Sequence, residues 1–389
     1  MAIDHRNMTR IKNRKLVLQQ LFNNDEISRA EIARRLNLNK STVSSIYSDL
    51  KEEGYIEEIR QGESSSNGGR KPSMIKLNRN YGFVASFNVG TTYLASMFNY
   101  TNGEIIQYDR QEIAEFDILN IMQMIKQKIN ELQKVNQTRH GLLAICFSVH
   151  GIVFNNEVRD SPFLHLNGVD LRKYFEQEFD VPVVLENEAN LTAVFEQDYC
   201  TGSEINNLIA ISVHRGIGMG IITAGSLYRG NLGTAGEIGR DLTRLPDGSQ
   251  VKVESLCSED VIFNQVMAAK GLKKLSHDEL RELYINDDEA RKIVDTAIQR
   301  IADVAYNAIV TLGPQEVFFS SSIFEELPGV FDNLQQELVK MGAFSPIRMV
   351  QGSRYASLLG ASSMAIHHGL GLQGYWLRLK KPQETENIG

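Results

Sequence analysis

Short hydrogen-bonding side chains are concentrated between residues 39 and 48, at positions that fall on the polar side of a helix. Hydroxyl, amide and ammonium groups of this size approach base edges and phosphates without blocking a DNA groove. We therefore expect this segment to contact DNA through Asn39, Lys40, Ser41, Thr42, Ser44 and Ser45.

A second candidate for DNA contact is the dipeptide Arg70-Lys71, which follows a polar, glycine-rich stretch from Gln61 to Gly69. A guanidinium group at the tip of a hairpin can enter the narrow minor groove, where the negative potential is strongest. The apolar runs on either side, Tyr55 to Ile59 and Met74 to Leu77, are typical of strands. They predict such a hairpin, which is called the wing below.

The helices that must position these residues are predicted by local signals. Ser28, with Glu31 three residues later, forms a capping box in which each side chain satisfies an amide at a helix start. Apolar residues then recur at helical spacing, stop at residues 37–39 and resume. With a first helix from Met8 to Phe22, the pattern predicts a winged helix-turn-helix domain over residues 1–78. Its apolar positions are Ile32, Leu36, Val43, Ile46 and Leu50.

The alternative for this domain is a small helical pair with no DNA role, since a polar face is normal for any solvated helix. The predicted wing and the charge distribution favour DNA. The chain carries a net charge of −7, yet residues 1–76 contain 14 Lys and Arg against 10 Asp and Glu, and the remainder contains 27 against 38. The basic end therefore coincides with the predicted DNA-binding end.

Composition excludes several classes of protein. The three cysteines, Cys146, Cys200 and Cys257, are odd in number and widely spaced, which argues against a disulfide framework or a metal knuckle. We expect buried thiols in a reducing compartment. No apolar run reaches the roughly 18 to 20 residues of a membrane span, and no hydrophobic targeting segment follows the N-terminus. A soluble, cytoplasmic protein of two or three domains is expected.

Beyond residue 78 the sequence becomes α/β, and one plan occurs twice. Each half opens with strand, glycine turn and strand, and continues with helices and buried strands. Asn102-Gly103 in the first half predicts a hairpin turn, and the second half is predicted to contain a helix near residues 324–340. Two similar lobes favour a two-lobed, actin-like architecture that holds a ligand between the lobes. We expect the first lobe at 79–186 and the second at 187–389, with a closing helix at 356–369 packing back on the first.

Two motifs carry a resemblance to a known family. Asn231 to Gly239 (NLGTAGEIG) is similar to the G-x-A-G-E-x-G-H sugar segment of the ROK family of repressors, open reading frames and kinases, and Glu186 to Asn190 (ENEAN) is similar to its E-N-D-A-N. With its N-terminal domain, nearly the whole chain resembles a ROK transcriptional repressor. The resemblance implies release from operator DNA by an inducer sugar, with D-xylose as the expected inducer.

The resemblance also implies a sugar site. Amide and carboxylate groups accept strong hydrogen bonds from neutral hydroxyls. The alternative is that the acids lie on the surface, as most glutamates do, and Phe163 fits either a narrowed pocket or the core. His150 and His165 are expected to be structural. The predicted sugar contacts are Asn187, Glu188, Glu237, Glu254 and Phe163.

The sequence differs from ROK kinases at positions that take part in phosphoryl transfer. The metal-managing aspartate of ROK kinases is here an asparagine, bulky residues open the second phosphate turn, serines replace adenosine-side glycines, and the catalytic aspartate is a glutamate. We therefore expect no catalytic residues, no cofactor and no enzyme activity. The alternative is an ATP-dependent sugar kinase with a DNA-binding appendage. The residues concerned are Asn88, His214-Arg215, Ser320-Ser321 and Glu188.

The family's Cys₃His zinc site is also altered. Its four positions hold Arg240, Leu245, Asp247 and Lys252, which are not the soft ligands that a structural zinc requires. We expect no metal, with Arg240 as a cationic cross-link in its place.

Partners follow from the same reasoning. A helix-turn-helix usually reads two half-sites through a two-fold dimer, so we expect a homodimer on a palindromic duplex operator, a small-molecule sugar and no membrane partner. A further alternative is a repressor that has lost sugar binding and responds to a protein.

Overall fold

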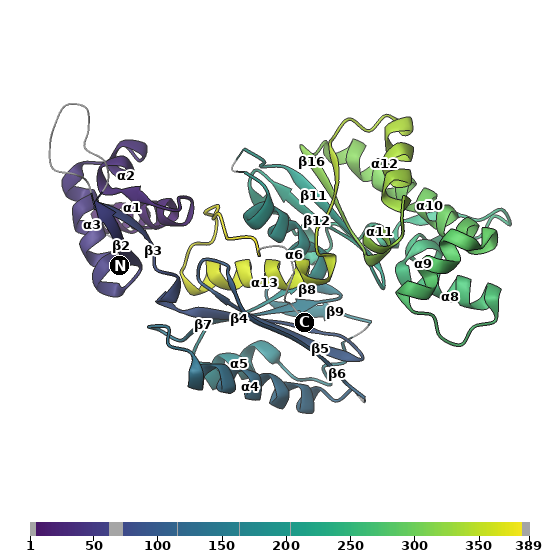
Figure 1. Cartoon of the computed structure of the whole chain (residues 1–389), viewed down its shortest axis with the longest axis horizontal. Coiled ribbons are helices and arrows are strands. Elements are labelled where there is room, and N and C mark those ends of the chain that lie inside the picture. The colour runs from purple at the N-terminus through teal and green to yellow at the C-terminus, as the bar shows by residue number, and fades with distance from the viewer. Residues whose placement is uncertain (1–4, 62–72, 115, 163, 203, 383–389) are drawn as a thin grey trace. The chain divides into compact units, whose positions relative to one another are not determined.

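The computed structural model describes residues 5–61, 73–114, 116–162, 164–202 and 204–382 (Figure 1). They form two compact units. The first unit contains the described residues of 1–147, 165–184 and 362–389, and the second those of 148–164 and 185–361. Residues 148–164, which were predicted for the first lobe, thus belong to the second unit. The predicted domain boundaries near residues 78 and 186 stay predictions.

The N-terminal part of the first unit has the element order of a winged helix. Its predicted apolar positions Ile32, Val43, Ile46 and Leu50 are buried, and helix α3 ends at Gly54, whose φ of 96° lies in the left-handed region that glycine tolerates. The strands pair antiparallel in the order β1-β3-β2. The elements are α1 (His5–Phe22), β1 (Ile27–Ser28), α2 (Arg29–Arg35), α3 (Lys40–Glu53), β2 (Ile56–Gln61) and β3 (Ser73–Leu77).

The predicted capping box is only half formed. Ser28 Oγ accepts a hydrogen bond from the backbone N–H of Glu31 at 3.2 Å. The Glu31 carboxylate, however, binds Arg34 at 2.6 Å and Arg35 at 2.7 Å, and these hydrogen bonds lower its pKa to about 2. The reciprocal bond was predicted wrongly, because two guanidinium groups one turn away offer a carboxylate stronger partners than one amide does.

The rest of the first unit is built on a five-stranded sheet with the order β10-β7-β4-β5-β6. The predicted Asn102-Gly103 turn joins β5 to β6, and the Gly103 N–H donates to the Tyr100 carbonyl at 2.9 Å. Helices α4 and α5 lie on one face of the sheet (Figure 1). The elements are η1 (Arg79–Tyr81), β4 (Phe83–Val89), β5 (Tyr93–Tyr100), β6 (Ile105–Glu112), α4 (Ile118–Val135), β7 (Leu142–Val149), α5 (Leu171–Phe179) and β10 (Val183–Asn187).

The end of the chain returns to the N-terminal winged-helix part of the first unit. After α13 (Ser353–Gly369), residues 370–382 form a segment that we call the C-terminal strap. Within the first unit, the Trp376 carbonyl accepts hydrogen bonds from Gln19 at 2.8 Å and Asn23 at 3.3 Å, both on or next to α1. The Arg378 N–H donates to Asn23 at 2.8 Å. The strap therefore ties α1 to the last residues of the fold.

The second unit has its own five-stranded sheet, in the order β13-β12-β11-β16-β17. Strands β11 and β12 are antiparallel, whereas β11, β16 and β17 are parallel. The strands are β11 (Leu208–Val213), β12 (Ile217–Thr223), β13 (Ser226–Leu227), β16 (Glu316–Ser320) and β17 (Ile347–Met349), with small hairpins β8 (Ile152–Phe154) with β9 (Glu157–Asp160) and β14 (Leu242–Arg244) with β15 (Gln250–Lys252). The helices are α6 (Glu188–Phe195), η2 (Glu196–Cys200), η3 (Asn231–Gly233), η4 (Ile238–Arg240), α7 (Glu254–Cys257), α8 (Glu259–Lys270), α9 (His277–Asn286), α10 (Asp288–Leu312), α11 (Ser322–Glu326) and α12 (Val330–Met341).

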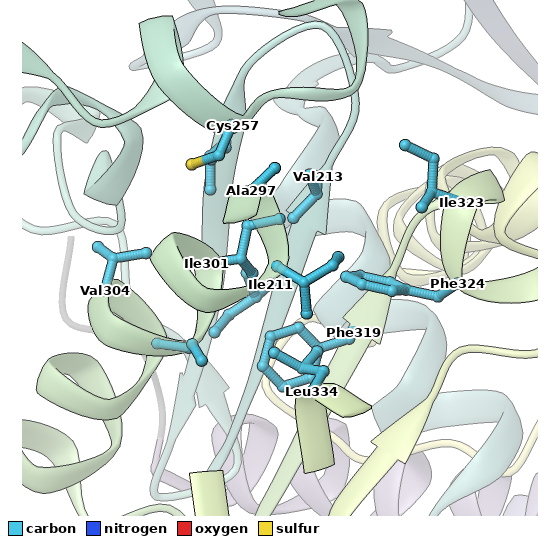
Figure 2. Packing of buried hydrophobic residues seen from close by; sticks show 14 of the residues in the cluster. Ile211, Val213, Cys257, Ala297, Ile301, Val304, Phe319, Ile323, Phe324 and Leu334 are labelled. Atoms are coloured by element: carbon cyan, nitrogen blue, oxygen red, sulfur yellow. The ribbon is translucent and has the colours of Figure 1, made fainter. Parts of the chain in front are cut away.

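The core of this unit lies between the sheet and helix α10. Ile211 and Phe319 from the sheet pack with Ile301 of α10 and Leu334 of α12, as Figure 2 shows. Burial of these apolar side chains is the main favourable term in folding this unit. The candidate site begins where β11 and β16 end.

Two predictions of local structure were wrong. The helix predicted near residues 324–340 is two helices, because Pro328 has no amide to donate and Gly329 adopts a φ of 77°. The thiols of Cys146 and Cys257 are buried as predicted, but Cys200 is exposed at the end of η2. Among the described residues, no helix is long and apolar enough to cross a membrane.

Candidate functional site

The predicted DNA-contacting residues lie at the start of α3. Asn39 is the residue before the helix and makes no side-chain cap bond there. Lys40, Ser41 and Ser45 are exposed, whereas Thr42 and Ser44 are half-buried. Polar groups at the N-terminal end of a second helix are in the position from which helix-turn-helix proteins contact bases. Arg70 and Lys71 lie outside the described residues.

A cavity of about 450 Å³ in the second unit is lined by four of the five predicted sugar residues: Asn187, Glu188, Glu237 and Glu254. The fifth, Phe163, lies outside the described residues, although its neighbour Pro162 lines the cavity. His150 also lines the cavity, while His165 belongs to the first unit and packs on Phe116.

Asn187 and Glu188 reach the cavity from the start of α6. Asn187 caps this helix, because its Oδ1 accepts from the amides of Ala189 and Asn190, and its Nδ2 donates to the Gly151 carbonyl at 2.8 Å. Most of the hydrogen bonds of the Asn187 side-chain amide therefore stabilise the backbone of the cavity wall. Glu188 follows in the first helical turn, where it is buried with 8% exposure. Its carboxylate accepts a hydrogen bond from Thr192 at 3.4 Å.

Two glycines explain why Glu237 points where it does. A Cβ at Gly236 would collide with the Met219 carbonyl of β12, and one at Gly239 would crowd the Ile217 carbonyl. Only glycine allows this segment to lie against β12, where the Met219 N–H donates to the Gly236 carbonyl at 2.8 Å. Burial raises the pKa of Glu237, Arg240 opposes this shift, and Glu254 and Asp160 add to it.

Arg240 links two carboxylates of the cavity wall. Its Nη2 lies 2.8 Å from Asp160 on β9, and its Nε lies 2.9 Å from Glu237. The guanidinium thus forms the cationic cross-link that was expected at this position. Glu254, at the start of α7, lies 3.6 Å from Lys252.

Behind Glu188 lies an acid–base cluster that sequence reasoning missed. His214, at the end of β11, lies 3.6 Å from Glu188 through Nε2 and 3.8 Å from Glu259 through Nδ1. Burial lowers the pKa of His214, but the charges of Glu188 and Glu259 outweigh burial and raise the pKa to about 9. For Glu259, burial acts to raise the pKa, but hydrogen bonds from His214, His277 and Ser322 hold the pKa of this carboxyl group well below its usual range.

Ser322, His277 and Glu259 have the residue types of a hydrolase triad, but their geometry excludes that chemistry. Ser322 Oγ lies 2.8 Å from His277 Nε2, and Glu259 lies 3.2 Å from the same nitrogen. A triad needs the base and the acid on opposite ring nitrogens. In addition, Ser322 donates to Glu259 directly at 2.7 Å. The cluster therefore serves to hold Glu259.

The charges of the cavity wall are nearly balanced, because four cations pair with five carboxylates and Arg240 serves two of them. Each lining carboxylate has a cationic partner: Asp160 and Glu237 have Arg240, Glu188 has His214, Glu254 has Lys252 and Asp260 has Arg215. Such a wall presents many donors and acceptors with little excess charge, so it suits a neutral, hydroxyl-rich ligand. Among the described residues, no group of acidic, histidine and cysteine side chains could hold a metal ion.

Comparison with known proteins gives consistent results. Residues 84–368 match the ROK family, and residues 12–57 match winged helix-turn-helix DNA-binding domains. The chain is 39% identical to the xylose repressor of Lactiplantibacillus pentosus, over 97% of this chain and 98% of that one. It is 33% identical to the xylose repressor of Staphylococcus xylosus, over 95% and 98%.

Among solved structures, a ROK family transcriptional regulator described as a homolog of the E. coli MLC protein superposes with a TM-score of 0.76. It is 19% identical and covers 93% of this chain and 98% of its own, which shows a shared fold. The match to the family covers most of the chain, and the two motifs that predicted it lie on the wall of one cavity. The chain belongs to the ROK family and carries a winged helix-turn-helix DNA-binding domain ahead of the ROK body.

Proposed function

We propose that this protein is a transcriptional repressor that binds operator DNA through its winged helix and leaves it when a neutral sugar binds in the cavity of the second unit. One observation carries the proposal: Asn187, Glu188, Glu237 and Glu254, from three separate stretches of chain, line a single cavity whose charges are paired. The N-terminal helix-turn-helix supplies the DNA-binding end.

We propose D-xylose as the inducer. Carboxylates held by Arg240 and Lys252 accept hydrogen bonds from hydroxyls without the excess charge that would require an ionic ligand. The two relatives reported above are named xylose repressors, and this chain matches them over nearly their whole length. This similarity supports a pentose as the inducer. Phe163, next to the lining residue Pro162, stays a proposed contact.

We also propose that the chain transfers no phosphate. Asn88 offers no charge to a metal ion, and its side chain is buried. Glu188, at the position of the catalytic base in ROK kinases, has the His214 imidazole beside it at 3.6 Å. The kinase alternative predicts ADP release from ATP and one sugar of a panel, and a coupled assay at background rate for every sugar would exclude it.

We propose further that the operator is a palindromic duplex read by a homodimer, because a helix-turn-helix contacts one half-site per copy. Sedimentation of the protein with and without duplex DNA tests this assembly directly.

The test of the whole proposal uses a DNA duplex that the protein itself selects from a random pool. D-xylose should raise the melting temperature, since a ligand at 100 times its Kd adds about 2.7 kcal/mol to native stability. The same sugar should release the duplex in a gel shift, while glucose and N-acetylglucosamine should do neither. A sugar that stabilises the protein without releasing DNA would contradict the repressor mechanism, and release by another sugar would correct the inducer.

A further inference from the structure

We propose that His214 and Glu188 form a paired donor and acceptor for one hydroxyl group of the bound sugar, and that Glu259 is the positioning residue that fixes His214. The inference rests on the proposed sugar site and adds two residues to it. It assigns to His214 a direct role in recognising the ligand.

The geometry leaves a place for a hydroxyl. His214 Nε2 and Glu188 Oε1, both on the cavity wall, are 3.6 Å apart, which is longer than the 2.7 to 3.2 Å of a hydrogen bond. A hydroxyl oxygen at hydrogen-bond distance from both atoms accepts from the ring N–H and donates to the carboxylate. One such group satisfies a donor and an acceptor at once.

Glu259 is fixed by several elements of the second unit. Its backbone N–H donates to the His214 carbonyl at 2.8 Å. Its carboxylate accepts from Ser321 at 2.9 Å, from Ser322 at 2.7 Å and from His277 of α9 at 3.2 Å. A carboxylate held at so many points is a stationary counter-charge for the far side of the His214 ring.

The protonation state follows from the groups around His214. Glu188, Glu259 and Glu325 face it and raise its pKa to about 9, against the effect of burial. The other titratable or charged residues close to His214 in the cavity wall are His150, Arg215 and Asp260. Because the folded pKa is raised, both ring nitrogens donate at neutral pH. As pH rises through about 9 the ring loses one proton, and Glu259 keeps the remaining one on Nδ1, so Nε2 no longer donates to the hydroxyl.

A donor and an acceptor side by side discriminate between ligand groups. A sugar that lacks this hydroxyl forgoes both hydrogen bonds, whereas a phosphate at the same place meets the Glu188 carboxylate and lacks a proton to donate to it. The affinity lost with this one hydroxyl should be about 10- to 100-fold, the usual effect of a hydrogen bond to a charged group.

The experiment measures calorimetric affinity for D-xylose and its monodeoxy analogues between pH 6 and 10. His214→Ala should bind D-xylose about 10- to 100-fold more weakly. One monodeoxy analogue should bind the unmodified protein weakly and lose nothing further in His214→Ala, which identifies the hydroxyl. Unmodified protein should lose affinity above about pH 9. In His214→Gln, which keeps a donor that does not titrate, that loss should be absent.

The variant Glu259→Gln tests whether Glu259 acts on His214 or only supports the fold. It should move the alkaline loss of affinity to lower pH, because one of the charges that raise the pKa of His214 is removed. His165→Ala, a histidine of the first unit, is the matched control and should change neither affinity nor profile. Sugar binding by His214→Ala equal to that of the unmodified protein overturns this inference and leaves the proposed function standing. No binding of any of these sugars to the unmodified protein overturns both. If His214→Ala fails to fold, the deoxy series and His214→Gln decide.

Discussion

Glu237 is the acid whose position depends most on its own motif, since the flanking glycines let it lie against β12 and Arg240 holds it at 2.9 Å. We expect Glu237→Ala to weaken sugar binding about 10- to 100-fold, because an interaction with a charged acceptor is removed. DNA binding without sugar should not change. Gel-shift titration with rising sugar measures the release midpoint.

The control is Glu282→Ala, an exposed acid of α9. Glu254→Ala should behave as Glu237→Ala does. An unchanged release midpoint for Glu237→Ala would show that the glycine motif is a feature of the fold alone and that the inducer binds elsewhere.

Arg240 protects the sugar site from loss of affinity in acid. Burial raises the pKa of Glu237 and Arg240 opposes the rise, so Arg240→Ala should raise that pKa further. An ionised carboxylate accepts stronger hydrogen bonds from hydroxyls than a protonated carboxyl group does, so sugar affinity of the variant should fall with decreasing pH earlier than that of the unmodified protein. Arg240→Lys should fall between them, because an ammonium group keeps the charge without the planar fork. Coincident pH profiles for all three proteins would contradict this role.

At the scale of elements, α3 and the wing should contribute differently to DNA binding. Replacing Arg70 and Lys71 together by Ala should weaken binding to selected and random duplex alike and lower the salt slope by about one to two, since phosphate contacts are electrostatic. Thr42→Ala or Ser44→Ala should instead relax the base preference. The affinity measured over a salt series for both duplexes separates the two effects, and an unchanged slope in the double variant would refute the wing assignment.

The C-terminal strap should stabilise α1. Asn23→Ala removes a hydrogen bond to the Trp376 carbonyl and one from the Arg378 amide, each worth about 0.5 to 1.5 kcal/mol. Backbone amides of α1 should then exchange with deuterium faster, and the melting temperature should fall by a few degrees. Lys12→Ala, exposed on the same helix, is the control. Equal exchange in both variants would mean that the strap does not hold α1.

At the scale of the whole molecule, induction is a coupling free energy between two sites. A sugar releases DNA only if it binds the released form more tightly, and the coupling is then reciprocal. The factor by which saturating sugar lowers DNA affinity should equal the factor by which saturating duplex lowers sugar affinity. Calorimetry with and without bound duplex tests this equality. A sugar affinity that is the same with and without bound duplex would exclude the proposed induction.

Several features of this protein were predictable because they depend on neighbours in the chain. Helix α3 follows from the spacing of Val43, Ile46 and Leu50, which are buried as predicted, and the turn at Asn102-Gly103 follows from backbone conformations that few residues adopt. The break at Pro328-Gly329 was equally local and was overlooked. Membership of the ROK family was readable from two short motifs.

Other features required the tertiary structure, because they join segments that are distant in sequence. The sequence alone determined a DNA-binding helix pair, an α/β body and a set of candidate acids. Only the fold decided that Asn187, Glu188, Glu237 and Glu254 line one cavity, that Arg240 pairs with Asp160 80 residues away, and that Glu259 lies between His214 and Ser322. Glu259 has no local signature: an acid near a helix start is ordinary in sequence, and its partners are set by where β11 ends and where α9 and α11 begin. Glu237 and Glu254 find their cations within three residues of the chain. Asp160, Glu188 and Asp260 acquire theirs only when the sheet and helices of the second unit have assembled, so this part of the charge balance is a property of packing.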